Sequence, residues 1–86
     1  MPKVKLFAMF REIAGFGEIE VEGRNLREVI ENLVAKCPKL KEVFFSDGKL
    51  KEIVQIMVNG RHFRRNLEIE VSESDVIAIF PPVSGG

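Results

Sequence analysis

The last six residues, Pro81-Pro82-Val83-Ser84-Gly85-Gly86, are the part of the sequence whose residue types and spacing best fit a chemical task. A carboxylate that is adenylated and then attacked by a nucleophile needs open access from both faces. Gly86 has no Cβ to obstruct that access, and Gly85 lets the backbone pass through a narrow channel. The sequence therefore predicts Gly86 as the reacting end and Gly85 as its passage.

The four residues before the glycines would carry this end away from the folded part. Pro81-Pro82 stiffens the chain and favours extended polyproline geometry, and Val83 and Ser84 are small. Six residues reach at most about 20 Å, which is enough to enter a pocket of another protein. We expect a folded domain over residues 1–80 and a flexible tail over residues 81–86. A Gly-Gly pair alone is a weak signal, because it also ends linkers.

Composition and charge narrow the class of protein. Hydrophobic residues make up 45% of the chain, and no run approaches the roughly 18 apolar residues of a membrane span. The 13 basic and 13 acidic residues cancel, so the basic excess of a general nucleic-acid binder is missing. One cysteine excludes an internal disulfide and a Cys-x-x-Cys metal pair. We expect a cytoplasmic protein with no membrane, nucleic-acid or metal partner.

The first half of the chain predicts a hairpin followed by a helix. Alternation over Lys3–Phe10 and Glu18–Glu22 indicates two strands, joined by a turn or short helix over residues 11–17. The helix should begin after the N-cap Asn25, with Glu28 in a capping-box-like position, and end before Pro38. Its apolar stripe is Leu26, Val29, Ile30, Leu33, Val34 and Cys37.

The second half predicts mainly strands. Residues 40–45 fit a second short helix, and Ile53–Val58 reads as a buried strand. Asn59-Gly60 is a strong hairpin signal, with a return strand over Arg61–Arg64. Apolar and acidic residues then alternate over Leu67–Val71. The last strand, Val76–Phe80, runs directly into the tail.

This order of elements predicts an α+β protein of the β-grasp, or ubiquitin-like, class, with a mixed sheet packed on one main helix. A ferredoxin-like fold is the alternative. It requires a second full helix, for which residues 39–45 are short.

A docking surface for partners is predicted on the outer face of the sheet. If Val4, Leu6 and Ala8 face the helix, Phe7 and Met9 lie on the opposite face. Phe80 of the last strand shares that face. Two aromatic side chains and a methionine on an uncovered sheet face would form an apolar patch that another protein could cover. The competing interpretation is that a loop covers them.

Other residues that could do chemistry have simpler interpretations. Cys37 fits a small core residue, and His62 has no partner at metal-ligand spacing and fits the surface. Arg61, Arg64 and Arg65 fit a solvated hairpin, although they could steer the domain towards an acidic partner. Gly15-x-Gly17 lacks the context of a phosphate-binding loop.

Both ends of the sequence resemble the small subunit of molybdopterin synthase, a family of ubiquitin-like sulfur carriers. The run from Phe80 to Gly86 is similar to the C-terminal signature of that family. Residues 4–15, an aromatic-rich strand followed by Arg-Glu-x-x-Gly, resemble its start. The spacing from Asp75 to Pro81-Pro82 also matches, whereas Ser74 stands where the family commonly has glycine.

The resemblance implies a carrier, not an enzyme. An E1-like adenylyltransferase would use ATP to adenylate the Gly86 carboxylate, and a sulfur donor would convert the adenylate to a thiocarboxylate. The tail would then enter the large subunit of molybdopterin synthase and give its sulfur to a pterin precursor. The product is the dithiolene that binds molybdenum or tungsten. The chain itself would bind no cofactor and supply no catalytic residue.

Three alternatives share parts of this interpretation. A ubiquitin-like modifier would be activated in the same way, but would be joined through Gly86 to lysines of other proteins. A sulfur carrier of the thiamine pathway has the same Gly-Gly end, although Phe80-Pro81-Pro82 is less typical of it. A plain adaptor would carry the tail without using it.

Overall fold

The computed structural model describes residues 1–62 and 66–82, with the backbone alone at His62. Within these residues, β2-β1-β7-β5-β6 form one sheet and β3-β4 form a separate hairpin. The elements in chain order are β1 (Lys3–Leu6), α1 (Ala8–Ala14), β2 (Glu18–Glu20), α2 (Leu26–Lys36), α3 (Lys39–Phe44), β3 (Phe45–Ser46), β4 (Lys49–Leu50), β5 (Gln55–Val58), β6 (Arg61–His62) and β7 (Val76–Phe80).

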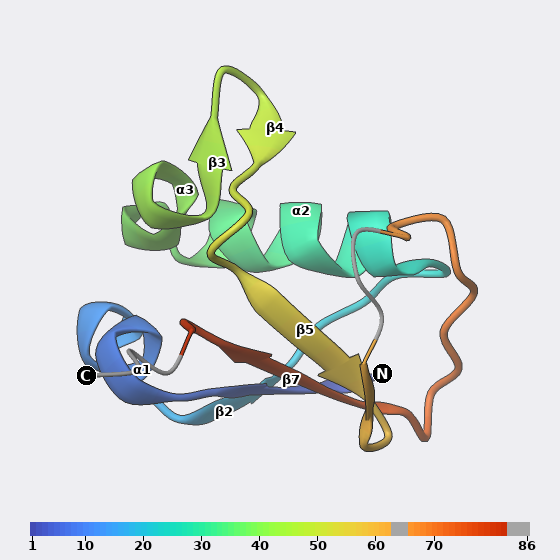
Figure 1. The fold of residues 1–86 in the computed structure, drawn as a ribbon. Coiled ribbons are helices and arrows are strands. Elements are labelled where there is room, and N and C mark those ends of the chain that lie inside the picture. Colours follow the sequence, from blue (N-terminus) through green and yellow to red (C-terminus); the bar gives the residue numbers. More distant parts are fainter. Residues whose placement is uncertain (63–65, 83–86) are drawn as a thin grey trace.

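The main sheet is mixed and packs on one main helix. β1 and β7 pair in parallel at its centre, whereas β1–β2, β5–β7 and β5–β6 are antiparallel. Figure 1 shows α2 lying across one face of this sheet, with the β3–β4 hairpin standing apart from it. The predicted α+β, β-grasp architecture is confirmed. The ferredoxin-like alternative is wrong, because α3 spans only 6 residues.

α2 forms where its apolar stripe and its cap predict it. Leu26, Val29, Ile30 and Leu33 are buried in the core, Cys37 is buried at the C-cap, and Val34 packs at the margin. The side chain of Asn25 accepts a hydrogen bond from the backbone N–H of Glu28 at 2.8 Å. The Glu28 carboxylate accepts one in return from the N–H of Arg24, one residue before the cap. The predicted cap and the predicted core position of Cys37 are confirmed.

The expected strand over Lys3–Phe10 is too long. β1 ends at Leu6, and the chain enters α1 through Ala8, whose φ of 52° lies in the left-handed region. Phe10 is fully buried, and its ring meets that of Phe44 edge-on, with the ring centroids 4.9 Å apart. Phe10, Ile13 and Ala14 all pack on the core at helical spacing, so helical packing overrides the apparent alternation beyond Leu6.

Two later segments also differ from the expectation. β5 begins at Gln55, because residues 52–53 form a turn, and the side chain of Ile53 is 45% exposed. The return strand β6 is Arg61–His62, and the rest of its predicted length lies outside the described residues.

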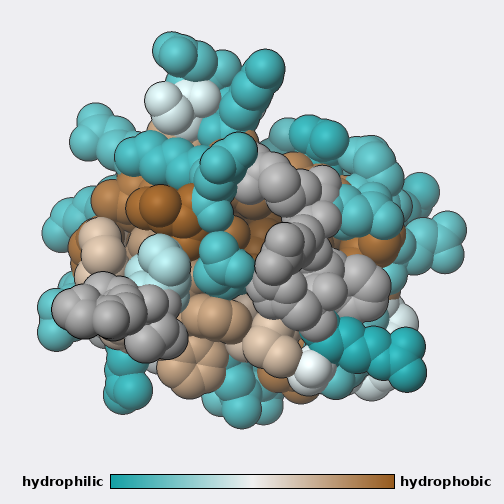
Figure 2. Space-filling model, viewed as in Figure 1, coloured by the Kyte–Doolittle hydropathy of each residue, from teal (hydrophilic) through white to brown (hydrophobic). Residues whose placement is uncertain are grey.

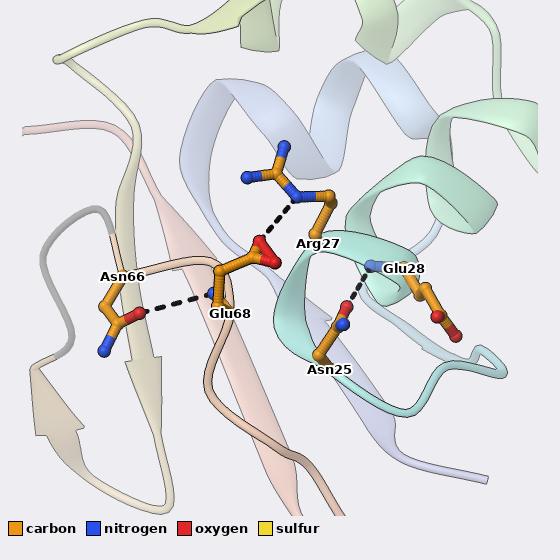
Figure 3. Close-up of polar contacts among 5 residues, drawn as sticks. All are labelled: Asn25, Arg27, Glu28, Asn66 and Glu68. Atoms are coloured by element: carbon orange, nitrogen blue, oxygen red, sulfur yellow. Dashed lines mark hydrogen bonds and ion pairs between the residues drawn. The ribbon is translucent and has the colours of Figure 1, made fainter.

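The segment 66–71 keeps its alternating burial but is not a strand of the sheet. Its carbonyl groups at Leu67 and Ile69 accept hydrogen bonds from the N–H groups of Arg27 and Leu26, at 2.8 and 3.0 Å. These are amides of the first turn of α2, which lack partners inside the helix. Figure 3 shows the ion pair between Arg27 and Glu68 (2.7 Å) that ties the same segment to α2. The segment therefore pairs with the residues that enter α2, through an isolated antiparallel bridge between Asn25 and Glu70, and not with the main sheet.

Candidate functional site

β7 is the element that positions the tail. It is hydrogen-bonded on both sides, to β1 from Val76 to Ile79 and to β5 from Ile77 to Phe80. Ile77 and Ile79 are completely buried against the helix layer. Val76, Ala78 and Phe80 alternate with them on the outer face, as predicted. The root of the tail is thus a central strand, the most firmly held kind of strand in a sheet.

A polar network holds the start of β7. Asp75 accepts hydrogen bonds from the backbone N–H of Ser72 and from the side-chain amide of Asn59, both at 2.8 Å. The side-chain oxygen of Asn59 accepts a hydrogen bond from the backbone N–H of Val76 at 2.9 Å. These hydrogen bonds hold the pKa of the Asp75 carboxyl below its ordinary value. The bond from the N–H of Ser72 has the largest effect, and the bond from the Asn59 amide has the next largest. Partial desolvation opposes this shift.

Replacing Asp75 with alanine removes both of its acceptor bonds and should lower the free energy of unfolding by about 1–2 kcal/mol. Urea unfolding at neutral pH measures this loss. Glu73→Ala is the matched control, since Glu73 is an exposed acid in the same turn. An equal loss in both variants would mean that the Asp75 network does not stabilise the fold.

The same network predicts a pH dependence. The carboxylate of Asp75 has a lower pKa in the folded chain than in the unfolded one. Its contribution to stability is therefore complete above the unfolded value of about 3.9 and is lost as the pH falls through the folded value. The difference in unfolding free energy between the original chain and Asp75→Ala should shrink as the pH is lowered from 6 to about 3. A constant difference across this range would contradict the assignment.

The tail leaves the sheet at Pro81, which is half-buried, and Pro82, which is exposed. Neither proline has an N–H to donate, so the β7 ladder stops at Phe80, as predicted. The residues predicted to react and to pass through a partner, Val83, Ser84, Gly85 and Gly86, lie outside the described residues. Their roles stay predictions.

An apolar groove of about 620 Å³ lies at the root of the tail, on the outer face of the sheet. Phe7 and Phe80 meet in it edge-on, with ring centroids 6.4 Å apart. Figure 2 shows hydrophobic residues, tan to brown, gathered across the middle of the face over β5 and β7, between hydrophilic residues. The groove is lined by Phe7, Ala8, Met57, Ala78, Phe80, Pro81 and Pro82.

The structure brings together two of the three residues predicted for docking. Phe7 is 44% exposed and lies beside Phe80, because its N–H continues the ladder to the carbonyl of Ile79. Met9 is equally exposed at 44%, but it belongs to α1 and does not line the groove. The prediction that Met9 shares the outer sheet face was wrong, because it assumed that the strand continued. For the same reason Ala8 was wrongly predicted to face the helix, whereas it is exposed and lines the groove.

Sequence reasoning missed Met57 as a wall of this groove. Its signal was present, since β5 alternates between the buried Ile56 and Val58 and the outward Gln55 and Met57. In the sheet, Met57 pairs with Ala78 of β7, on the floor of the groove. The groove is therefore an apolar surface open to solvent, suited to take up an apolar side chain of a partner.

The remaining candidates give no second reactive centre in the described part of the chain. Gly15, with φ of 84°, caps the C-terminus of α1, the wrong end of a helix for phosphate binding. No three His, Cys, Asp or Glu side chains are grouped to hold a metal ion among the residues described. Arg61 is exposed, whereas Arg64, Arg65 and the side chain of His62 lie outside the description. In the same residues, no helix is long and apolar enough to cross a membrane.

Fold and groove together define a β-grasp protein that presents a tail beside an apolar surface, and comparison with known proteins agrees. The model of the ThiS family matches residues 4–86. The molybdopterin synthase sulfur carrier subunit of Dictyostelium discoideum is 32% identical over 98% of this chain and 94% of its own length.

Two solved structures are similar over nearly their whole length. Small archaeal modifier protein 1 from Methanosarcina acetivorans has a TM-score of 0.89 and 40% identity, covering 99% of this chain and 95% of its own. A chain of the Amycolatopsis orientalis BexX/CysO complex has a TM-score of 0.87 and 26% identity, covering all of both chains. The present chain belongs to the ThiS family of ubiquitin-like sulfur carriers and modifiers. One of these relatives is named as a sulfur carrier subunit of molybdopterin synthase, and another was solved in a complex with BexX.

Proposed function

We propose that this chain is the sulfur carrier of molybdopterin synthesis, working through a thiocarboxylate at Gly86. The observation that carries the proposal is the match to the molybdopterin synthase carrier of Dictyostelium discoideum over 94% of that protein's length. It is supported by the match of the ThiS family model up to residue 86 and by an apolar groove at the root of the tail.

The chain is a substrate in the first step. An E1-like adenylyltransferase joins the Gly86 carboxylate to the AMP part of ATP and releases pyrophosphate. A sulfur donor then displaces AMP and leaves a thiocarboxylate on Gly86. ATP is bound by the partner and not by this chain, and we place the reaction in the cytoplasm, where ATP is available.

The chain is a sulfur donor in the second step. The large subunit of molybdopterin synthase receives the tail, and the sulfur of Gly86 passes to a pterin precursor. This chain docks on the partner and projects its tail into it. The groove around Phe7 and Phe80 holds the partner, and Pro81-Pro82 directs the tail away from β7. No side chain of the carrier acts as acid, base or nucleophile in this scheme.

A reconstituted assay tests the pathway. The thiocarboxylated chain is mixed with the large subunit of molybdopterin synthase and the pterin precursor, and the dithiolene product is measured by oxidation to its fluorescent pterin derivative. We expect product in proportion to the thiocarboxylate added, and none from the unmodified chain. Thiocarboxylate that persists without giving product would contradict the molybdopterin assignment while leaving the carrier chemistry intact.

A second function, protein modification, is favoured by the 40% identity to the small archaeal modifier protein 1 of Methanosarcina acetivorans. Activation would be the same, but a lysine amine of a target protein would displace AMP and form an amide with Gly86. Mass spectrometry of proteins from cells that express a tagged chain would then find lysines carrying a Gly-Gly remnant after digestion that cuts before Gly85. Absence of conjugates, with activation intact, would exclude this second function.

A further inference from the structure

A second groove, of about 510 Å³, lies on the helix layer of the molecule, whereas the groove at the tail lies on the outer face of the sheet. In Figure 1, the β3–β4 hairpin rises beside α2 and α3, on the side of the sheet that α2 covers. The lining of this second groove comes from α2, α3, β3 and the turn of the hairpin: Glu31, Val34, Lys41, Glu42, Phe45, Asp47 and Gly48.

The lining of this groove combines an apolar floor with an acidic rim. Val34 and Phe45 are half-buried and pack against the hydrophobic core. The carboxylates of Glu31, Glu42 and Asp47 are exposed around them, with Lys41 as the one cation of the lining. Within the described residues, none of the three carboxylates is paired with a basic side chain. The rim therefore has a net negative charge that is open to an incoming cation.

The hairpin that bears Asp47 is a defined wall. Asp47 and Gly48 both have positive φ, 52° and 76°, as the two central residues of a tight hairpin turn. Phe45 pairs with Leu50, which is buried, and this pairing fixes the hairpin on the core. Asp47 is thus held at the rim by backbone geometry.

We propose that this groove binds a basic segment of a partner protein. A lysine or arginine has both the alkyl stem that the floor of Val34 and Phe45 would cover and the cationic head that the carboxylates would attract. The carboxylates form no group suited to a metal ion among the described residues. The chain's own tail has no basic residue, so it does not match the rim. Because the two grooves lie on different layers, the segment can bind while the tail is in use.

Nuclear magnetic resonance of the ¹⁵N-labelled full chain tests the proposal. The probe is the acetylated, amidated peptide Leu-Arg-Leu-Arg, and the counter-probe replaces both arginines with glutamate. We expect saturable shifts at the amides of residues 31–35 and 41–48 with the basic peptide, weakened by added salt. The acidic peptide should produce none.

Charge reversal within the groove provides the decisive comparison. Glu42→Lys should weaken binding of the basic peptide about tenfold, because an attraction becomes a repulsion. Glu73→Lys makes the same change of net charge at an exposed site outside the groove and should leave the affinity unchanged. Both variants should unfold at the temperature of the original chain, since both side chains are exposed.

Three outcomes would overturn the proposal: shifts that do not saturate, shifts confined to the sheet groove around Phe7 and Phe80, or equal weakening by Glu42→Lys and Glu73→Lys. The last would show attraction to overall charge only. A chain shortened to residues 1–82 should bind the peptide as tightly as the full chain. Failure of the tail chemistry therefore leaves this result unaffected.

Discussion

We expect Gly85→Val to slow adenylation of the chain by the proposed E1-like partner by at least about 100-fold. The reason is steric, since a branched Cβ next to Gly86 obstructs the passage of the backbone and displaces the carboxylate from the reacting phosphate. Exchange of labelled pyrophosphate into ATP measures the rate. Affinity for the partner and the thermal unfolding temperature should both stay unchanged, because the groove around Phe7 and Phe80 and the core lie within residues 1–82.

Val83→Ala is the matched control for this variant. It also alters the tail but removes atoms instead of adding them, so it should react at nearly the original rate. A Gly85→Val chain that is adenylated as fast as the original would show that the passage is not narrow. The predicted role of Gly85 would then be wrong, although that of Gly86 would stand.

We expect Phe7→Asp to weaken binding to the proposed E1-like partner by at least about 30-fold, or 2 kcal/mol. Phe7 is 44% exposed at the rim of the groove and packs edge-on against Phe80. A carboxylate at this position would have to lose its water against an apolar partner surface. Isothermal titration calorimetry without ATP separates this loss of affinity from any effect on the chemistry. The thermal unfolding temperature should fall only slightly, because the side chain is already exposed.

Met9→Asp is an unusually close control. Met9 has the same exposed fraction as Phe7 and lies two residues away, but its side chain does not line the groove. It should bind the partner with nearly the original affinity. Equal weakening by both variants would mean that the partner covers a wider surface that includes α1, as the sequence alone suggested. A collapse of stability in Phe7→Asp would mean that Phe7 belongs to the core.

The sequence predicts the centre of the fold better than its connections. Strict alternation in Val76–Phe80 and the apolar stripe of α2 each have one buried face, and burial of that face determines the structure. The predicted strand over Lys3–Phe10 was too long because Ala8 and Phe10 also fit an alternating pattern. The helix is selected where Phe10, Ile13 and Ala14 pack on the core, with Phe10 against Phe44, which is distant in sequence. Such long-range contacts are invisible to local periodicity.

The candidate site was also predicted only in part, because some of its residues come together through long-range contacts. Phe7 and Phe80 were brought together by strand pairing, which the alternation implies. The alternation of β5 places Met57 on the outer face, but its position beside Ala78 depends on the register between β5 and β7, which the sequence does not reveal. The acidic rim of the helix-layer groove likewise joins residues from α2, α3 and a turn, and no motif connects them.

The central claim is that Gly86 carries sulfur, and intact mass spectrometry tests it most directly. The full chain is incubated with the proposed E1-like partner, ATP and a sulfur donor, beside a matched sample without ATP. We expect a mass gain equal to the exchange of one oxygen for one sulfur, located by fragmentation on Gly86 and absent without ATP. A chain that is adenylated under these conditions but never gains sulfur would contradict the account.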